Sequence, residues 1–184
     1  MWQQFTDQLP QGFSLLGDGM GFYFGSAVLV LLALIPTAGR IAGVLSGQHI
    51  LKLPVNFLLE CIVLAGRIAF IAAIFVVGNT MDTTGLTRPD SWLYLGQDIA
   101  LLLSVEWAGF AAKLLVAAVV LLAIQGAMTY LVTEQRTAKV LERMQNKATP
   151  GTVERIIELT IQNMVIVPLF LVCIFLALQL VEVG

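Results

Sequence analysis

Charged residues are scarce in this chain of 184 residues. Only 12% of its residues are Asp, Glu, Lys or Arg and 58% are hydrophobic, whereas a soluble domain is about 25% charged. Ten Lys and Arg stand against twelve Asp and Glu, so the chain lacks the basic excess of a nucleic-acid-binding protein. The composition therefore predicts an integral membrane protein without a nucleic-acid partner.

Side chains that build metal, disulfide and catalytic sites are also few. The chain has two cysteines, Cys61 and Cys173, both inside apolar segments, and one histidine, His49. This set is too small for a Cys/His metal site or a disulfide framework, and no serine has a histidine at a matching depth. We therefore expect no enzyme, no cofactor and no metal site. No Lys or Arg precedes Arg40, so we expect no secretory signal peptide.

Four long apolar segments dominate the sequence. A helix needs roughly 20 apolar residues to cross a bilayer, and each segment reaches about that length. We expect an all-α integral membrane protein, one four-span domain over residues 1–184. Its transmembrane helices are predicted at residues 19–45, with a kink at Pro36, and at 55–79, 108–132 and 159–180.

Shorter amphipathic segments flank these spans. Residues 1–18 carry apolar side chains three or four apart, interrupted by Pro10, which predicts an N-terminal interfacial segment lying on the membrane. Residues 98–107 are apolar but too short to span, so we expect a second interfacial or partly inserted helix there. Aromatic residues near it are predicted to anchor it at the interface: Trp92, Tyr94 and Trp107.

Residues 133–158 are strongly charged and predict a short helical hairpin between the third and fourth spans. Pro150 and Gly151 form its expected turn, and Thr152 is the expected N-cap of the next helix. Its apolar residues either join the two arms, which we favour, or bind a soluble cytoplasmic partner. These residues are Val140, Leu141, Met144, Ile156 and Ile157.

Positive charge is distributed unevenly among the connections. The hairpin holds five Lys or Arg, and Arg40 and Lys52 border the first connection, whereas the second connection has only Arg88. By the positive-inside rule, the hairpin is cytoplasmic and both termini lie outside a bacterial-type plasma (inner) membrane.

Two sets of glycines are spaced four residues apart, which lets helices approach closely within the chain or between chains. They are Gly17, Gly21 and Gly25, and Gly39, Gly43 and Gly47.

Ionisable residues inside the spans are the main functional signal. Glu60 and Arg67 lie on one face of the second span, and Arg40 lies at a depth that matches Glu60. We expect Arg40 to pair with Glu60, which leaves Arg67 without a negative partner. An intramembrane charge of this kind normally faces protein or water and has a function.

Neutral groups are the remaining candidates to contact Arg67, namely Gln125 and Asn163. Lys113 is expected to extend towards Glu106 or the lipid headgroups. A partner's carboxylate, a water-filled cavity or an anionic ligand would each satisfy Arg67, unless the buried charges only fix the helix register.

The leading prediction is a non-catalytic subunit of a larger, transport-related membrane assembly that docks through the glycines and the Glu60 and Arg67 face. The alternative is a homo-oligomeric ion or small-solute channel or carrier with Arg67 and Glu60 lining its pathway. A membrane-embedded lipid-handling enzyme is a third, weaker alternative. The expected partners are membrane lipid and either other membrane subunits or further copies of this chain.

Overall fold

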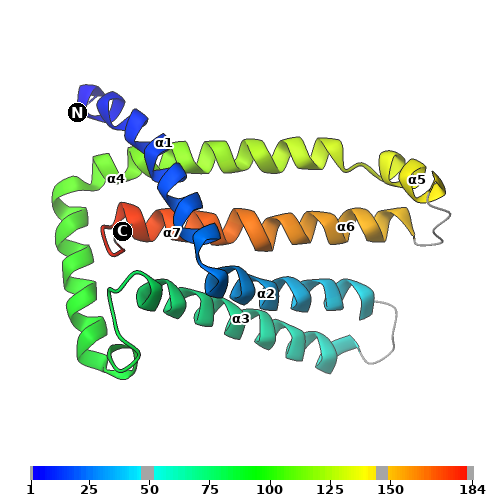
Figure 1. The fold of residues 1–184 in the computed structure, drawn as a ribbon, viewed down its shortest axis with the longest axis horizontal. Coiled ribbons are helices and arrows are strands. Elements are labelled where there is room, and N and C mark those ends of the chain that lie inside the picture. The colour runs from blue at the N-terminus through cyan, green and yellow to red at the C-terminus, as the bar shows by residue number, and fades with distance from the viewer. Residues whose placement is uncertain (1, 47–51, 144–148, 182–184) are drawn as a thin grey trace.

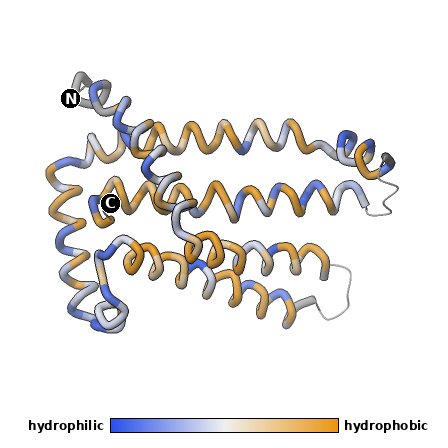
Figure 2. The backbone as a smooth tube through the Cα atoms, viewed as in Figure 1, coloured by the Kyte–Doolittle hydropathy of each residue, from blue (hydrophilic) through white to orange (hydrophobic). Residues whose placement is uncertain are grey.

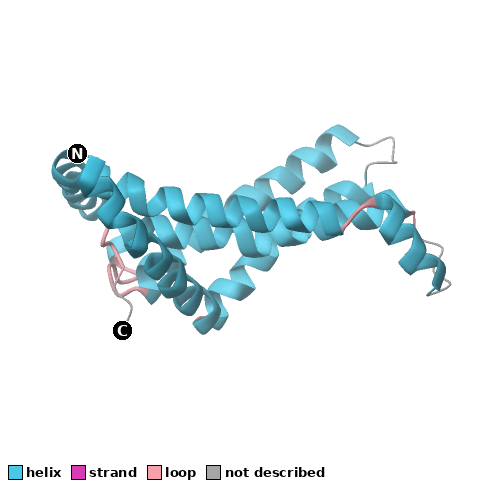
Figure 3. Cartoon of the chain, turned by 90° about the horizontal axis from the view of Figure 1, so that it is seen from above, coloured by secondary structure: helices cyan, strands magenta, loops and turns pink. Residues whose placement is uncertain are grey.

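The computed structural model describes residues 2–46, 52–143 and 149–181, so His49 and Gly47 lie outside the described residues. Within these ranges the chain is helical and contains no strand (Figures 1 and 3). The elements are α1 (Trp2–Gly25), α2 (Ala27–Ser46), α3 (Lys52–Val77), the short 3-10 helix η1 (Gly85–Thr87), α4 (Pro89–Leu131), α5 (Glu134–Arg143), α6 (Pro150–Ile161), the π-helical turn η2 (Gln162–Ile166) and α7 (Val167–Ala177).

Four helices are long and apolar enough to cross a membrane, which confirms the prediction of an all-helical chain with four such segments. This pattern is that of a multi-pass membrane protein. The apolar segments are Ala27–Leu45, Pro54–Val77, Pro89–Leu131 and Pro150–Ala177.

The spans run side by side along the long axis of the molecule. The α6–α7 helix lies between the second part of α4 and the α2–α3 pair (Figure 1). One end of this bundle carries α5 and is called the hairpin end here. The other end, where the chain begins and finishes, is called the terminal end (Figure 1). Figure 2 shows hydrophobic backbone along the spans and hydrophilic residues at α5.

The predicted first span at residues 19–45 is wrong as a single helix, because the chain breaks between α1 and α2. The Ser26 amide donates to the Tyr23 carbonyl at 3.3 Å, and the Ser26 hydroxyl accepts the Leu29 amide at 3.4 Å. This serine thereby caps the start of α2, as serine commonly does. The helix continues across Pro36, where the kink was expected.

The N-terminal segment, expected to lie on the membrane surface, forms part of α1 and packs on other helices of the chain. Helix α1 runs diagonally across α4 and α7 (Figure 1). A Cβ at Gly12 would lie 2.6 Å from Val116 Cβ, and one at Gly19 would lie 3.0 Å from Cys173 Sγ. These two glycines therefore allow α1 to contact both helices at close range.

Helix α4 changes direction at Glu106, whose backbone angles (φ −121°, ψ 19°) are not helical. Its first part crosses the terminal end of the bundle, and its second part runs along the other spans (Figure 1). From the sequence, the interfacial helix was expected to end at residue 107 and the span to begin at residue 108, close to the bend at Glu106 in the structure. The crossing part begins at Pro89, however, nine residues before the expected segment.

The fourth span contains a π-helical turn before Pro168. Because proline has no amide proton, it cannot donate to the carbonyl four residues earlier, that of Met164. The Tyr23 hydroxyl donates to that carbonyl at 2.6 Å, and the Tyr23 side chain is fully buried. A contact from α1 thus compensates the interruption that Pro168 introduces.

The hairpin arms pack against each other, with Thr137 and Leu141 of α5 buried. Val140 is 52% exposed, so part of the apolar set faces outward. The expected N-cap at Thr152 is wrong: Thr149 is the N-cap and Pro150 the first helical residue. Proline suits this position because its fixed φ is already helical and the missing amide proton is not needed there.

A buried apolar core fills the half of the bundle towards the terminal end. It is formed mainly by α1, α2, α3 and α7 and includes Tyr23, Leu29, Phe70, Ile74, Leu169, Val172 and Cys173. Arg40, Glu60, Arg67 and Asn163 are not part of this core.

A basic cavity between α2, α3 and α6

A cavity of about 470 Å³ lies in the hairpin half of the bundle, between α2, α3, α6 and the π-helical turn. Four charged residues line it: Arg40 from α2, Glu60 and Arg67 from α3, and Arg155 from α6. Asn163 of the π-helical turn also lines the cavity. The cavity thus brings together residues from three separate helices.

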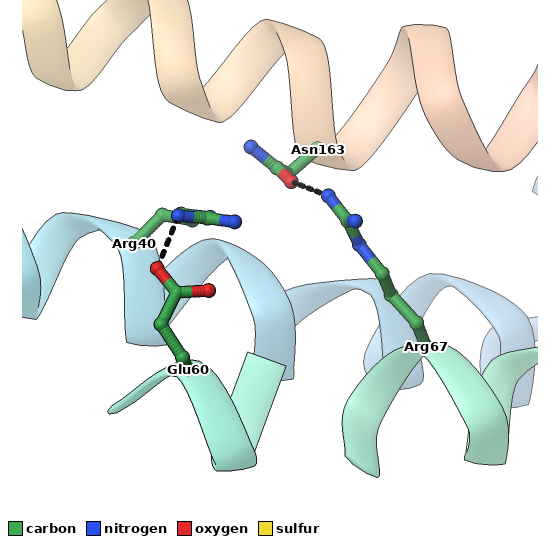
Figure 4. A network of polar contacts seen from close by, with 4 residues as sticks. All are labelled: Arg40, Glu60, Arg67 and Asn163. Atoms are coloured by element: carbon green, nitrogen blue, oxygen red, sulfur yellow. Dashed lines mark hydrogen bonds and ion pairs between the residues drawn. The ribbon is translucent and has the colours of Figure 1, made fainter. Parts of the chain in front are cut away.

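The expected pairing of Arg40 with Glu60 is present, with an N–O distance of 2.5 Å (Figure 4). Arg40 lies five residues before the end of its apolar span at Leu45, and Glu60 lies six residues after the start of its span at Pro54. The two side chains are 35% and 57% exposed. They form a partly open ion pair near the hairpin end.

Arg67 lies deeper. It is thirteen residues after Pro54 and ten before Val77, near the middle of its apolar span. Relative to Glu60, it lies seven residues, or about 10.5 Å, further along the helix axis. The Arg67 guanidinium therefore places a positive charge near the middle of a helix long enough to cross a membrane.

The polar partner of Arg67 is Asn163, whose Oδ1 accepts a hydrogen bond from the Arg67 guanidinium at 3.4 Å (Figure 4). Among the described residues, no carboxylate lies within ion-pair distance of Arg67. That Arg67 lacks a negative partner stays a prediction. A neutral amide orients this guanidinium without neutralising it.

Asn163 is itself fixed in place. It is 4% exposed, and its Nδ2 donates to the Leu159 carbonyl at 2.9 Å. It is also part of the π-helical turn, a type of distortion frequent at functional sites. The turn therefore contributes directly to the contact with Arg67.

Arg155 was noticed in the sequence only as a charge that sets orientation, yet it lines the same cavity. Its guanidinium contacts Glu158 at 3.1 Å, one helical turn away. Since Arg155 lies five residues after Pro150, its depth in the apolar span matches that of Arg40 and Glu60. The sequence assigned Arg155 to the hairpin before the predicted span at 159–180, so its depth became visible only when the helix was seen to begin at Pro150.

Gln125 is not a partner of Arg67. It lines a second, smaller cavity of about 230 Å³ on the other side of α6, between α4 and α6. Arg155 and Gln162 border both cavities.

Lys113 is half-buried on α4 and does not contribute to either cavity. No ion pair joins it to Glu106 among the described residues, and its other expected direction, towards the lipid headgroups, stays a prediction.

The predicted packing glycines divide into two groups. Gly39 lies against α3, where an added Cβ would be 2.8 Å from a Val63 methyl group, and Gly43 faces Leu59 more loosely at 3.9 Å. The other set, Gly17, Gly21 and Gly25 on α1, has no heavy atom within 4 Å of an added Cβ. Of the two kinds of contact that the spacing left open, this set does not make the one within the chain.

Charge in the cavity is unbalanced. Three guanidiniums (Arg40, Arg67 and Arg155) and one carboxylate, Glu60, line the cavity. Arg40 pairs with Glu60, and Arg155 pairs with Glu158 of the second cavity, so among the described residues of the lining the charge of Arg67 is the one left unbalanced. Within the described ranges, no group of three or more His, Cys, Asp or Glu could hold a metal ion. The chemistry that this arrangement offers is the binding of a negative group.

No protein-family model, curated protein or solved structure matches this chain.

Proposed function

We propose that this chain is an anion-binding component of a membrane transport system, a channel or carrier whose substrate meets Arg67 inside the cavity. The observation that carries the proposal is the environment of Arg67. Arg67 lies in the middle of an apolar span and lines the 470 Å³ cavity. Its hydrogen-bond partner is the neutral amide of Asn163.

Electrostatics favours this function. An arginine at the centre of a membrane helix costs at least about 2.5–3.5 kcal/mol unless water or a counter-charge compensates it. Asn163 supplies only an amide oxygen, so the remaining compensation comes from the contents of the cavity. An anion entering from solvent would supply the missing charge.

The shape of the site supports a carrier rather than an open pore. The cavity lies on the hairpin side, and the buried core that includes Phe70, Ile74 and Leu169 occupies the other side. Many transporters bind substrate near the membrane midplane beside interrupted helices. Here the π-helical turn at residues 162–166 is such an interruption, and its Gln162 and Asn163 line the cavity.

The positive-inside rule orients the proposed carrier with α5 and the cavity mouth towards the cytoplasm and both termini outside the plasma membrane. Reaction of single cysteines with a membrane-impermeant thiol reagent, placed at Gln135 in α5 and at Thr83 in the loop after α3, tests this orientation. The variants would carry Cys61→Ser and Cys173→Ala. Labelling of intact cells only at residue 83 is the expected result.

Flux of anions into liposomes that contain the purified protein tests the function. Arg67→Gln removes the charge and should abolish anion-dependent flux. Arg88→Gln removes the same formal charge from an exposed loop at the terminal end and should leave the flux unchanged. Absence of anion movement with the unmodified protein, together with absence of anion binding, would contradict the proposal.

A second candidate is a non-catalytic subunit of a larger membrane assembly. The open face of α1, with Gly17, Gly21 and Gly25, favours it because glycines four apart allow another helix to approach closely. Mild detergent extraction from native membranes, followed by mass determination of the intact particle, separates the candidates. Stoichiometric recovery of a different polypeptide would favour the subunit, and a particle built only from this chain would favour the carrier.

A further inference from the structure

The donor chemistry of Arg67 restricts the kind of anion that the cavity accepts. A guanidinium has five N–H donors arranged as a planar fork, which matches the two oxygens of a carboxylate or phosphate group. Asn163 accepts from one of the two terminal nitrogens, Nη2. The other donors are oriented by this contact and are not used by Asn163, so an oxyanion can be held by two parallel hydrogen bonds.

The charge balance restricts the valence of the ligand. Arg40 is paired with Glu60 and Arg155 with Glu158, so the excess in the cavity is the single charge of Arg67. A monovalent anion at Arg67 neutralises this excess, whereas a divalent one leaves an unbalanced negative charge in the cavity.

The remaining walls of the cavity restrict the rest of the ligand. Val44, Leu59 and Leu159 contribute apolar surface next to the charged groups. The volume of about 470 Å³ falls within the range of about 300–1,000 Å³ that is typical of sites for small organic molecules. An inorganic ion would fill only a small part of it.

We infer that the ligand is a monovalent oxyanion with an apolar substituent, a carboxylate or a phosphodiester, whose oxygens bind Arg67 while its substituent contacts Leu59 and Leu159. This inference rests on the proposed function and names its substrate class. Two sources present this chemistry: a soluble organic acid, or the phosphodiester headgroup of a membrane lipid.

Substitution of Asn163 gives the sharpest test. Asn163→Asp keeps the size and position of the side chain but supplies a carboxylate 3.4 Å from the Arg67 guanidinium. The variant carries its own counter-charge, so its ligand affinity should fall at least tenfold. The substitution also removes the Nδ2 donor to the Leu159 carbonyl, so the thermal unfolding of the variant without ligand is measured beside its affinity. A cooperative unfolding transition together with the loss of affinity distinguishes loss of the site from loss of the fold.

Calorimetric titration of the delipidated protein in detergent would use hexanoate and dimethyl phosphate as monovalent oxyanions, and chloride and sulfate as comparators. We expect hexanoate or dimethyl phosphate to bind at least tenfold more tightly than chloride or sulfate. Arg67→Lys, which keeps the charge but loses the fork, should remove this preference, and Arg88→Gln should retain it.

The two sources are separated by native mass spectrometry of protein taken from nanodiscs of phosphatidylglycerol. A lipid retained by the unmodified protein and lost from Asn163→Asp identifies the headgroup as the ligand. Hexanoate binding without retained lipid identifies a soluble organic acid. Either result supports the inference.

Tighter binding of chloride or sulfate than of the two monovalent oxyanions would overturn the inference and leave the anion-binding function intact. Absence of binding by all four anions, with no lipid retained, would overturn the inference and the proposed function together. Undiminished hexanoate and dimethyl phosphate binding by a folded Asn163→Asp variant would show that the oxyanion does not bind at Arg67.

Discussion

The Tyr23 hydroxyl on α1 donates a hydrogen bond of 2.6 Å to the Met164 carbonyl in the π-helical turn. This carbonyl is the acceptor that Pro168 leaves without its usual helical donor. The contact joins residues 141 positions apart in sequence and fixes the turn that also presents Asn163 to Arg67. The N-terminal helix therefore supports the cavity without lining it.

Removal of this hydroxyl should destabilise the protein. Tyr23→Phe keeps the buried ring but leaves the Met164 carbonyl without its donor, which costs about 1–3 kcal/mol for a buried acceptor. Thermal unfolding in detergent should show a lower midpoint. Tyr94→Phe, at a side chain that is 65% exposed, is the matched control and should unfold like the unmodified protein. Equal midpoints for both variants would show that the contact does not stabilise the turn.

Two glycines of α1 should respond oppositely to alanine. Gly12→Ala places a Cβ 2.6 Å from Val116 Cβ, so α1 must move away from α4, at a typical cost of about 1–3 kcal/mol. Gly21→Ala meets nothing within 4 Å and should be neutral or stabilising by up to about 1 kcal/mol, because alanine favours helix. Unfolding midpoints of the two purified variants make the comparison.

The same Gly21→Ala variant also tests the second candidate function. If the open face of α1 binds another subunit, Gly21→Ala should reduce recovery of that subunit on extraction without lowering the stability of the isolated chain. If a polypeptide that co-purifies with the unmodified protein is recovered equally well with Gly21→Ala, this face of α1 is not the contact.

Neutralisation of Glu60 should increase anion affinity. Glu60→Gln raises the excess charge of the cavity from one to two, since Arg40 loses its partner. At a separation of about 10.5 Å and an effective dielectric constant of about 20, removal of the repulsion between Glu60 and an anion at Arg67 is worth roughly 1.6 kcal/mol, or about 15-fold in affinity. Titration with hexanoate measures this change. Glu142→Gln, on the exposed surface of α5, is the control. Weaker binding by Glu60→Gln would show that Glu60 contacts the ligand directly.

The loop between α3 and α4 should lose order in acid. A hydrogen bond from the Thr84 hydroxyl at 2.5 Å, another from the Gly85 amide at 2.6 Å and the positive charge of Arg88 lower the pKa of Asp82 below its usual 3.8. Because the folded pKa is depressed, this carboxylate stabilises the loop above its usual pKa and ceases to do so as the pH falls through the lowered value. The contribution of Asp82 to the stability of the loop should therefore be constant from pH 5 to pH 8.

Titration of the Asp82 carboxyl by NMR measures this effect. Thr84→Val removes the largest cause of the shift and should raise the pKa of Asp82 towards 3.8. Thr83→Val, at an exposed neighbour, should leave it unchanged. An identical pKa in the Thr84→Val variant would mean that the hydroxyl does not stabilise the carboxylate.

The sequence by itself determined the helical class, the number of membrane-length segments and the pairing of Arg40 with Glu60. These features depend on hydrophobic length and on helical spacing, which are local properties of the chain. It also predicted that Arg67 has no negative partner, because few carboxylates lie in the spans.

Only the tertiary structure decided which neutral group meets Arg67 and which glycines pack. Asn163 rather than Gln125 faces Arg67 because η2 lies beside α2 and within reach of α3, whereas Gln125 lies on the far side of α6. Gly12 and Gly19 pack, and Gly17 and Gly21 do not, because α1 crosses α4 and α7 instead of continuing into α2. The direction in which a helix crosses its neighbours follows from side-chain packing between distant segments, which spacing along one segment cannot specify.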